Sequence, residues 1–475
     1  MRIVQTFWTA GQDPLKHSFG WSHPQYNLMS WALSCLSLRE HYDDVELYTD
    51  SAGYHILIEV LGLPYTKTHV VFDDFKCLPH HWALAKIKTY SMQTEPFIHV
   101  DGDIYVPKPL PKEVEDAPLV AQNREIGTSY YRRMIDKGVL CYPSIQIPDF
   151  MVDGVKAESV SSYNTGFFGG SDIEFIQSYC DEVFRFIDSN KLNEQDCPHS
   201  MANCNVFMEQ AFFATLADQK GKDVFCIYVD PVQDNGYCVE EFCYLNNYFS
   251  KPFFHLLGGH KRNEYILNML SRSLLLFYPN MLQHILHMYK GENVIYRNGG
   301  VSTSQIFLNY FPLVCRDEIA KIISNWNLLN VDDVFRWERA VANDIIYNSV
   351  SSNKNKKISI CPWLCTYSFP KTLEKSHILS LNARLNKSRN FPLKEIALIP
   401  CIYGLGIKEI ALTEITKQLL HLLSCDDYSV EQLRNALIFK YKINKPEDKQ
   451  TLEEILLSEL EKLQNSGFIC LTFKE

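Results

Sequence analysis

Residues 97 to 106 decide the fold, and they read Phe97-Ile98-His99-Val100-Asp101-Gly102-Asp103-Ile104-Tyr105-Val106. Four mostly apolar, strand-like residues lead into two aspartates separated by a glycine, and a second β-rich run follows before prolines stop it. We therefore expect the carboxylates of Asp101 and Asp103 at the end of a buried strand. In an α/β sheet, that end of a strand opens onto the crevice where ligands bind.

The two aspartates have two interpretations. Two hard oxygen donors this close together suit Mg²⁺ or Mn²⁺, which also bind phosphate oxygens. The alternative is a solvated turn, because Asp-x-Asp is short and common. Asp101-Gly102-Asp103 by itself is compatible with either.

Strands and helices are predicted to alternate through the first hundred residues. The expected helices cover residues 27–36, 52–61 and 82–90. The expected strands cover residues 2–8, 45–50 and 68–72, in addition to the opening stretch. This alternation predicts an α/β domain with a mainly parallel sheet and helices on both faces. The strand over residues 45–50 ends on two polar residues, Thr49 and Asp50.

Length and composition describe an ordinary globular chain. Its 475 residues suggest about two to four domains, and 46% hydrophobic with 21% charged residues allow sizeable cores. A net charge of -10 argues against a broad nucleic-acid footprint, which needs a basic surface. The 15 cysteines are odd in number and scattered, so we expect buried reduced thiols rather than a zinc or disulfide framework.

No targeting or membrane segment is expected. The chain opens on a strand-like run instead of a charged leader followed by an apolar core. The richest apolar stretch, residues 274–278 with their flanks, is interrupted by Arg272, Asn280 and Gln283 before it reaches the ~18 residues of a span. These features predict a soluble, cytoplasmic protein without a membrane span.

A second segment with chemical potential covers residues 253–262. His255 follows aromatic residues and precedes two glycines, after which come Lys261 and Arg262. Such a segment could offer an imidazole to a metal and cations to phosphates, with the glycines allowing close backbone approach. The simpler explanations are a strand-end core histidine and a solvated pair of charges.

The order of these segments resembles glycosyltransferase family 8, whose members are nucleotide-sugar-dependent enzymes of the GT-A fold. That family carries an acidic D-x-D at a strand end, here Asp101-Gly102-Asp103, and a distal H-x-x-G-x-x-K, which residues 255–261 fit at every fixed position. Its N-x-G turn corresponds to Asn164-Thr165-Gly166, and its D-Q pair to Glu209-Gln210, where glutamate replaces aspartate. The resemblance covers roughly residues 1–262.

The resemblance implies a divalent metal, Mn²⁺ or Mg²⁺, held by Asp101, Asp103 and His255. Such a metal would neutralise the donor diphosphate as the glycosidic bond breaks. Retention at the anomeric carbon is typical of the family, and Glu209 and Gln210 are the candidate catalytic residues near the sugar. The candidate donor-binding residues are Lys86 (with Lys88 as a rival), Thr49, Asp50, Asn164, Gly166, Gly258 and Lys261.

The remainder of the chain loses the alternation of strands and helices. Residues 263–392 are predicted to form a helical extension and linker, with helices over 265–289, 316–323 and 331–347. Residues 393–475 are predicted to form a small winged-helix α+β domain. Strands are expected over 395–400 and 408–412, joined by a turn over 404–406, and a last strand over 468–473.

Three helices are expected in this tail. The first covers residues 414–423, a capping box beginning at Ser429 opens the second, and a capping box beginning at Thr451 opens the third. This order of elements resembles the PqqD-like family, the leader-peptide recognition domains of pathways for ribosomally synthesised, modified peptides. The resemblance implies that the tail binds an extended leader peptide as an added strand, which would raise the acceptor's effective concentration.

Three functions fit these observations. The first is a metal-dependent glycosyltransferase acting on a precursor peptide docked by its leader. The second is a glycosyltransferase of polysaccharide or glycolipid assembly whose tail binds a regulatory protein. The third is a non-catalytic binding module built on a degenerate transferase fold. Binding of DNA by the winged helix is disfavoured because its third helix carries several glutamates.

Overall fold

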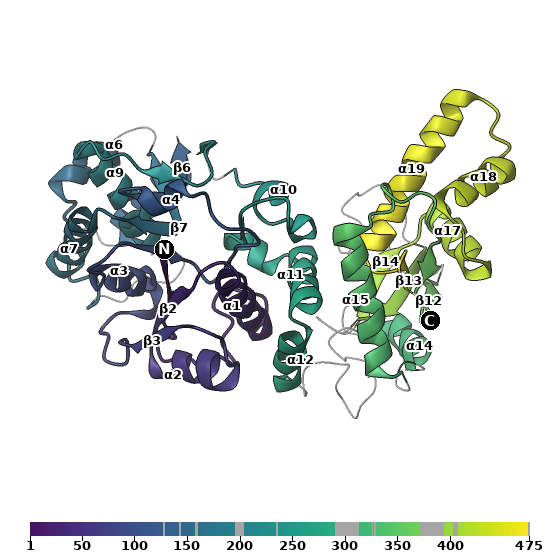
Figure 1. Cartoon of the computed structure of the whole chain (residues 1–475), viewed down its shortest axis with the longest axis horizontal. Helices are drawn as coiled ribbons and strands as arrows, with labels where there is room; N and C mark the ends of the chain where they lie inside the picture. The colour runs from purple at the N-terminus through teal and green to yellow at the C-terminus, as the bar shows by residue number, and fades with distance from the viewer. Residues whose placement is uncertain are drawn as a thin grey trace. The chain divides into compact units, whose positions relative to one another are not determined.

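The computed structural model of the protein has two compact units, Met1–Leu267 and Asn268–Glu475 (Figure 1). The boundary lies inside helix α11 (Glu264–Phe277). The structure describes residues 1–126, 129–141, 144–156, 160–194, 204–233, 236–289, 313–324, 326, 329–370, 394–401 and 407–473.

A mixed, mainly parallel sheet forms the centre of the N-terminal unit, which confirms the predicted α/β class. Its strand order is β3-β2-β1-β4-β7-β6-β8, with β9 also pairing with β6. Strand β7 runs antiparallel to β4 and β6, and the other pairs are parallel. The strands of this unit are β1 (Arg2–Phe7), β2 (Asp44–Thr49), β3 (Lys67–Val70), β4 (Phe97–Val100), β5 (Ile104–Tyr105), β6 (Val120–Ile126), β7 (Ser162–Gly170), β8 (Phe225–Cys226), β9 (Val232–Gln233) and β10 (Phe254–His255).

Helices cover both faces of this sheet, as adjacent residues of β1 demonstrate. Gln5 Nε2 donates to Ser34 Oγ on α1 (Pro24–Arg39), and Thr6 Oγ1 donates to Thr89 Oγ1 on α3 (Ala83–Ser91). Successive side chains of a strand point to opposite faces, so α1 and α3 lie on opposite sides of the strands, as Figure 1 shows.

The other helical elements of this unit surround the sheet and its connections. The helix expected over residues 52–61 begins as α2 (Ser51–Tyr54) and continues as a wider π-helix, η1 (His55–Val60). The remaining ones are η2 (Pro79–His81), α4 (Glu113–Asp116), α5 (Ser129–Cys141), η3 (Asp149–Met151), α6 (Val152–Lys156), α7 (Ile173–Ser189), α8 (Cys204–Val206), η4 (Phe207–Ala211), α9 (Phe212–Gln219), α10 (Val239–Phe242), η5 (Leu245–Asn247) and η6 (Gly258–Arg262).

Helices and a three-stranded antiparallel sheet, β12-β13-β14, build the C-terminal unit. Strand β12 comes from the region predicted to be a helical extension, and it pairs with β13 along four residues. A second pair joins β11 to β15. The elements are α12 (Pro279–Met288), α14 (Leu313–Ser324), α15 (Val331–Tyr347), β11 (Ser359–Ile360), β12 (Cys365–Ser368), β13 (Glu395–Pro400), β14 (Ile407–Ala411), α17 (Glu414–Cys425), α18 (Val430–Tyr441), α19 (Pro446–Asn465) and β15 (Ile469–Cys470).

Two predicted boundaries in this unit are wrong. Thr451 does not open the last helix, because α19 begins at Pro446 and the Thr451 hydroxyl donates to the carbonyl of Glu447 inside the helix. A proline at the first helical position needs no partner for a missing N–H, which makes it a better start. The single helix expected over 265–289 is two, because Pro279 begins α12 after Tyr278 leaves helical geometry.

Two other expectations for the tail have definite outcomes. The capping box at Ser429 is confirmed: Ser429 Oγ accepts from the N–H of Gln432, and Gln432 Oε1 accepts from the N–H of Ser429. The strand expected over 468–473 is limited to Ile469–Cys470. The turn predicted over 404–406 lies outside the described residues.

None of the described helices combines the length and the apolar character needed to cross a membrane.

Candidate functional site

Strand β4 places the two aspartates at the carboxyl edge of the sheet. Its register with β1 pairs Val4 with His99, so Asp101 follows just beyond the paired residues. The N–H of Asp101 donates to Gly166 O on β7 (2.9 Å), and a turn closes when the N–H of Ile104 donates to Asp101 O (3.1 Å). A Cβ at Gly102 would lie 2.6 Å from the indole of Trp31, so the residue between the aspartates has no room for a side chain.

A two-residue strand pair brings His255 to the aspartates across some 150 positions of sequence. In this pair His255 lies opposite Ile104 and Phe254 opposite Tyr105. The N–H of Leu256 donates to the carbonyl of Asp103 (3.0 Å), which extends the pairing to the acidic turn. The short helix η6 follows at once and carries Lys261.

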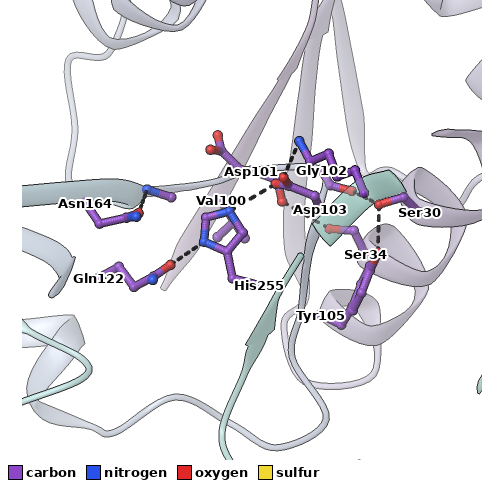
Figure 2. Close-up of polar contacts among 12 residues, drawn as sticks. Ser30, Ser34, Val100, Asp101, Gly102, Asp103, Tyr105, Gln122, Asn164 and His255 are labelled. Carbon is purple, nitrogen blue, oxygen red and sulfur yellow. Dashed lines mark hydrogen bonds and ion pairs between the residues drawn. The ribbon is translucent and has the colours of Figure 1, made fainter. Parts of the chain in front are cut away.

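Asp101, Asp103 and His255 converge on one point. Their nearest ligand atoms all lie within 4.8 Å of one another, and His255 Nε2 is 3.4 Å from Asp103 Oδ1. Figure 2 shows the imidazole between Gln122 on one side and the aspartates on the other. Two carboxylates and one imidazole form a mixed oxygen and nitrogen donor set, which suits a first-row divalent cation such as Mn²⁺. The residues present therefore fit the metal that the sequence analysis predicts.

Two lysines neutralise the carboxylates from opposite ends of the cluster. Lys261 Nζ is 2.5 Å from Asp103 Oδ2, and Lys86 Nζ is 2.8 Å from Asp101 Oδ1. Burial works against ionisation of Asp103, but the ammonium of Lys261 outweighs it and holds the pKa of this carboxyl well below its usual value. Burial raises the pKa of Asp101, and repulsion from Asp103 adds to the rise while Lys86 opposes it.

Glu209 lies beneath Lys86. It occupies η4, is 1% exposed, and its carboxylate forms an ion pair with Lys86 Nζ. Burial alone would lower the pKa of the Lys86 ammonium, but Asp101 and Glu209 outweigh it and raise the pKa. Its neighbour Gln210 turns elsewhere and accepts a hydrogen bond from Tyr131 Oη. The two residues of the predicted catalytic pair thus face different partners.

Asn164 and Gly166 support the cluster from β7. Asn164 Oδ1 accepts from the N–H of Gly166 (2.9 Å). A Cβ at Gly166 would lie 2.6 Å from His255 Cε1 and 2.9 Å from Gln122 Oε1. The glycine of the N-x-G turn therefore makes room for the imidazole.

Thr49 and Asp50 have structural partners. Asp50 Oδ2 accepts from the N–H and the hydroxyl of Thr9, and its Oδ1 caps α2 by accepting from the N–H of Gly53. Thr49 Oγ1 donates to the carbonyl of Phe7 (2.6 Å). Both side chains thus anchor strand ends and the loop that follows β1.

Gly258 begins η6 with a φ of +45°, in the left-handed region that favours glycine. This turn directs the chain from Leu257 towards Lys261. The loop after β1 meets the same segment: the N–H of Ser22 donates to Lys261 O (3.3 Å), and Lys261 Nζ lies 5.6 Å from the ring centroid of Trp21.

The sequence analysis did not predict the polar residues of β6. Gln122, Asn123 and Glu125 are buried, and Gln122 Oε1 is 2.6 Å from His255 Nδ1. Tyr237 belongs to this group, because its hydroxyl donates a hydrogen bond to Glu125 and accepts one from Asn164 Nδ2 (3.0 Å). A signal was available in the sequence, because residues 120–126 combine a strand-like length with four polar side chains.

Comparison with protein families places the chain. The model of a family of unknown function, DUF6734, matches residues 1–288. The chain belongs to this family. The range matched in DUF6734 includes every residue of the cluster, from Lys86 to Lys261.

Comparisons with individual proteins add one structural likeness. No curated protein matches this DUF6734 member in sequence. Among solved structures, the chain is similar to mouse Xyloside xylosyltransferase 1 in its apo form. The two share 11% sequence identity with a TM-score of 0.26, over 47% of this chain and 84% of that chain.

Proposed function

We propose that the N-terminal unit is a metal-dependent glycosyltransferase of the GT-A type that takes its sugar from a nucleotide-sugar donor. The observation that carries this proposal is the convergence of Asp101, Asp103 and His255 within 4.8 Å at the carboxyl edge of a mainly parallel sheet. That edge is where open α/β sheets bind ligands. Lys261 adds a cation beside the same carboxylates.

The three residues would hold Mn²⁺ or Mg²⁺. Such a cation, when bound, neutralises the diphosphate of the donor and stabilises the charge that grows on it during bond cleavage. Lys261 is suited to act on the same charge, because its ammonium lies 2.5 Å from Asp103 and its side chain is 23% exposed. Because η6 begins in a glycine turn, its backbone can approach a phosphate closely.

Lys86 and Glu209 take supporting roles in this proposal. Glu209 is 1% exposed and paired with Lys86, so it holds the lysine against Asp101 instead of facing a sugar. Lys86 in turn keeps Asp101 beside Asp103 by offsetting their repulsion. We therefore assign Glu209 as a positioning residue and leave Gln210, with Asn164, as the side chains proposed nearest the sugar.

The proposed reaction breaks the bond between the anomeric carbon and the diphosphate oxygen and forms a bond from that carbon to the acceptor. The nucleoside diphosphate leaves, and the acceptor loses its proton. We propose retention of configuration, as the resemblance to family 8 implies. Inversion would need a free carboxylate base, and the ion pair with Lys86 removes Glu209 from that role.

For the acceptor, we propose a ribosomally made precursor peptide whose leader docks on the C-terminal unit. The supporting feature is the antiparallel sheet β12-β13-β14, in which β14 pairs with β13 alone among the described strands. An end strand of this kind can accept an extended peptide through main-chain hydrogen bonds. Glycans of polysaccharide or glycolipid assembly are the rival acceptors.

The test is incubation of the full chain with Mn²⁺, a panel of nucleotide sugars, and a candidate peptide with its leader, followed by intact-mass measurement of the peptide. We expect a mass gain of one sugar, and a much weaker reaction with the same peptide lacking its leader. Equal transfer with and without the leader would remove the docking role of the C-terminal unit. Transfer to a lipid or glycan but to no peptide would establish the rival acceptor.

Donor binding is tested separately by calorimetry with nucleoside diphosphates in the presence and absence of Mn²⁺. A glycosyltransferase of this type should bind the diphosphate only with the metal. Binding of neither metal nor nucleotide would leave the fold as a non-catalytic module.

A further inference from the structure

We infer that Gln122 and Asn123 of β6 are positioning residues that fix the tautomer of His255, with a proton on Nδ1 and the lone pair of Nε2 facing Asp101 and Asp103. The effect of this tautomer on metal binding rests on the proposed function. The tautomer itself rests only on the hydrogen bonds among Asn123, Gln122 and His255.

The chain of hydrogen bonds starts at a backbone carbonyl. Asn123 Nδ2 lies 3.2 Å from Arg124 O and 3.1 Å from the hydroxyl of Tyr237. A carbonyl oxygen can only accept, so the amide nitrogen of Asn123 must occupy this side. Its Oδ1 is therefore an acceptor, which lies 3.0 Å from Gln122 Nε2 and 3.4 Å from the Tyr237 hydroxyl.

Gln122 passes this constraint to the histidine. Its Nε2 donates to Asn123 Oδ1 (3.0 Å), which leaves Gln122 Oε1 directed at His255 Nδ1 at 2.6 Å. An amide oxygen only accepts, so the proton of the neutral imidazole must be on Nδ1. Reversing the amide of Gln122 would place two oxygens against each other at 3.0 Å and is unfavourable.

A β-bulge makes the contact between Gln122 and Asn123 possible. Adjacent residues of a regular strand point to opposite faces, so their side chains do not normally bond to each other. The pairing of β6 with β7 shifts register between Ala121 and Asn123, and such a bulge re-aims a side chain. Both side chains are 0% exposed, so water does not compete for their amides.

The other end of this chain is also held. Tyr237 Oη donates its one proton to Glu125 and receives amide N–H groups from Asn123 and Asn164. Gly166 leaves the space that the imidazole needs beside Gln122. Each group has a definite donor or acceptor role, so the orientation of the imidazole follows from the fold.

The consequence concerns what His255 can do. With the proton on Nδ1, Nε2 offers a lone pair 3.4 Å from Asp103 Oδ1 and can act as a metal ligand. With the proton on Nε2, the same atom would donate a hydrogen bond to Asp103 and could not bind a cation. Gln122 and Asn123 thus select the ligand form of His255.

The first test measures the tautomer in the metal-free, full-length protein. Histidine is labelled with ¹⁵N, spectra that correlate the ring nitrogens with ring protons are recorded at about pH 8, above the ordinary histidine pKa, and H255Q assigns the signal. We expect a protonated Nδ1 and an unprotonated Nε2. A protonated Nε2 in the wild-type protein would overturn the inference.

The second test changes Gln122. Q122L removes the acceptor, so the His255 proton should distribute between both nitrogens. The matched control is Q93L, since Gln93 is also buried in this unit, where its amide donates to the carbonyl of Thr89. An unchanged His255 signal in Q122L would overturn the inference.

The third test examines the relay at Asn123, and it also serves if Q122L does not fold. Asn123 Oδ1 is the oxygen that holds Gln122 Nε2, and the control Q93L leaves it in place. N123L removes that oxygen and frees the Gln122 amide to rotate, so the tautomer should become mixed. Identical signals from N123L and Q93L would show that Asn123 does not act through Gln122.

The fourth test is Mn²⁺ affinity, measured by electron paramagnetic resonance of the free ion. We expect Q122L to weaken binding by roughly 10- to 100-fold, as loss of an outer partner of a metal ligand does, and Q93L to avoid this loss. Unweakened binding in a Q122L protein with a mixed tautomer would refute the consequence. Failure of the wild-type protein to bind Mn²⁺ would refute the proposed function while the tautomer measurements still decide the relay.

Discussion

Asp103 in the N-terminal unit and Asp344 in the C-terminal unit are both buried carboxylates, but their partners differ in kind. Asp103 faces side chains, Lys261 and His255, which come from distant segments and can rearrange around a ligand. Asp344, on α15, accepts from the thiol of Cys470 (2.9 Å) and from the backbone N–H groups of Leu471 and Thr472. A carboxylate bound to backbone N–H groups is committed to the fold, whereas one that faces side chains remains available for chemistry.

The largest expected effect comes from removing the charge of Asp103. In D103N, we expect Mn²⁺ affinity to fall by about 100-fold or more, beyond the loss caused by an outer partner of a ligand, and metal-dependent transfer to disappear. Paramagnetic resonance of free Mn²⁺ and turnover assays would measure both. The fold should persist, because Lys261 is partly exposed and can be hydrated.

The matched control for this variant is D172N. Asp172 pairs with Lys222 and caps α7, and asparagine is also a good cap. Metal binding should be retained in D172N. An equal loss of Mn²⁺ affinity in D103N and D172N would show that Asp103 is no more functional than a structural carboxylate.

Removing Asp344 should affect stability and leave the metal site unchanged. D344A leaves two half-buried N–H groups and a buried thiol without their acceptor, which should cost roughly 2–4 kcal/mol of unfolding free energy. Hydrogen exchange of residues 466–473 and denaturant unfolding of the full chain would measure the loss. The exposed acid of the same helix, Asp332, provides the control D332A, for which at most about 1 kcal/mol is expected. Loss of Mn²⁺ binding in D344A would contradict the comparison.

His81 extends the comparison to a buried group that lacks a counter-charge. Burial lowers its pKa from 6.5 to about 4, and the contact of Nδ1 with Asn193 (3.2 Å) only partly opposes the shift. Between pH 6.5 and 4, His81 therefore binds a proton in the unfolded chain but not in the folded one. Its contribution to the free energy of unfolding is complete above pH 6.5 and declines as the pH falls towards 4. The decline should reach roughly 3 kcal/mol from this group.

Replacing His81 isolates this contribution. The variant H81Q should lose the decline between pH 6.5 and 4 that His81 causes, as measured by denaturant unfolding at a series of pH values. The same slope in the wild type and in H81Q would mean that another group is responsible.

The smallest expected effect separates two serine or threonine positions in the C-terminal unit that have the same sequence signature. S429A removes a cap from α18 and should cost about 1 kcal/mol, whereas T451A changes a residue inside α19 and should stay within about 0.5 kcal/mol. Hydrogen exchange at the two helix starts would compare them. Equal losses of stability in S429A and T451A would mean that Thr451 caps a helix, as the sequence predicts.

The capping boxes show how far local sequence can be trusted. Ser429 and Thr451 are each followed three positions later by a residue that can complete a capping box, yet only Ser429 caps a helix. The difference lies upstream, where Pro446 supplies a start that fixes φ in advance and extends α19 by a turn. Local patterns are reliable when no stronger signal lies nearby.

The sequence alone determined three features of this protein. They are the alternation of strands and helices, the glycine between Asp101 and Asp103, and the spacing of His255 and Lys261. These features depend on local backbone preferences and on residue chemistry, which the letters state directly. They were sufficient to predict an α/β domain, and the resemblance to glycosyltransferase family 8 added the three side chains that converge.

Only the tertiary structure decided what surrounds those side chains. Three contacts join residues that are far apart in the chain. Glu209 is buried against Lys86, and Gly166 leaves space for His255. Asn123 is linked through Gln122 to the imidazole of His255. The physical reason is that such contacts depend on strand register and on one bulge in β6, and a shift of a single residue would turn each side chain to the opposite face of the sheet.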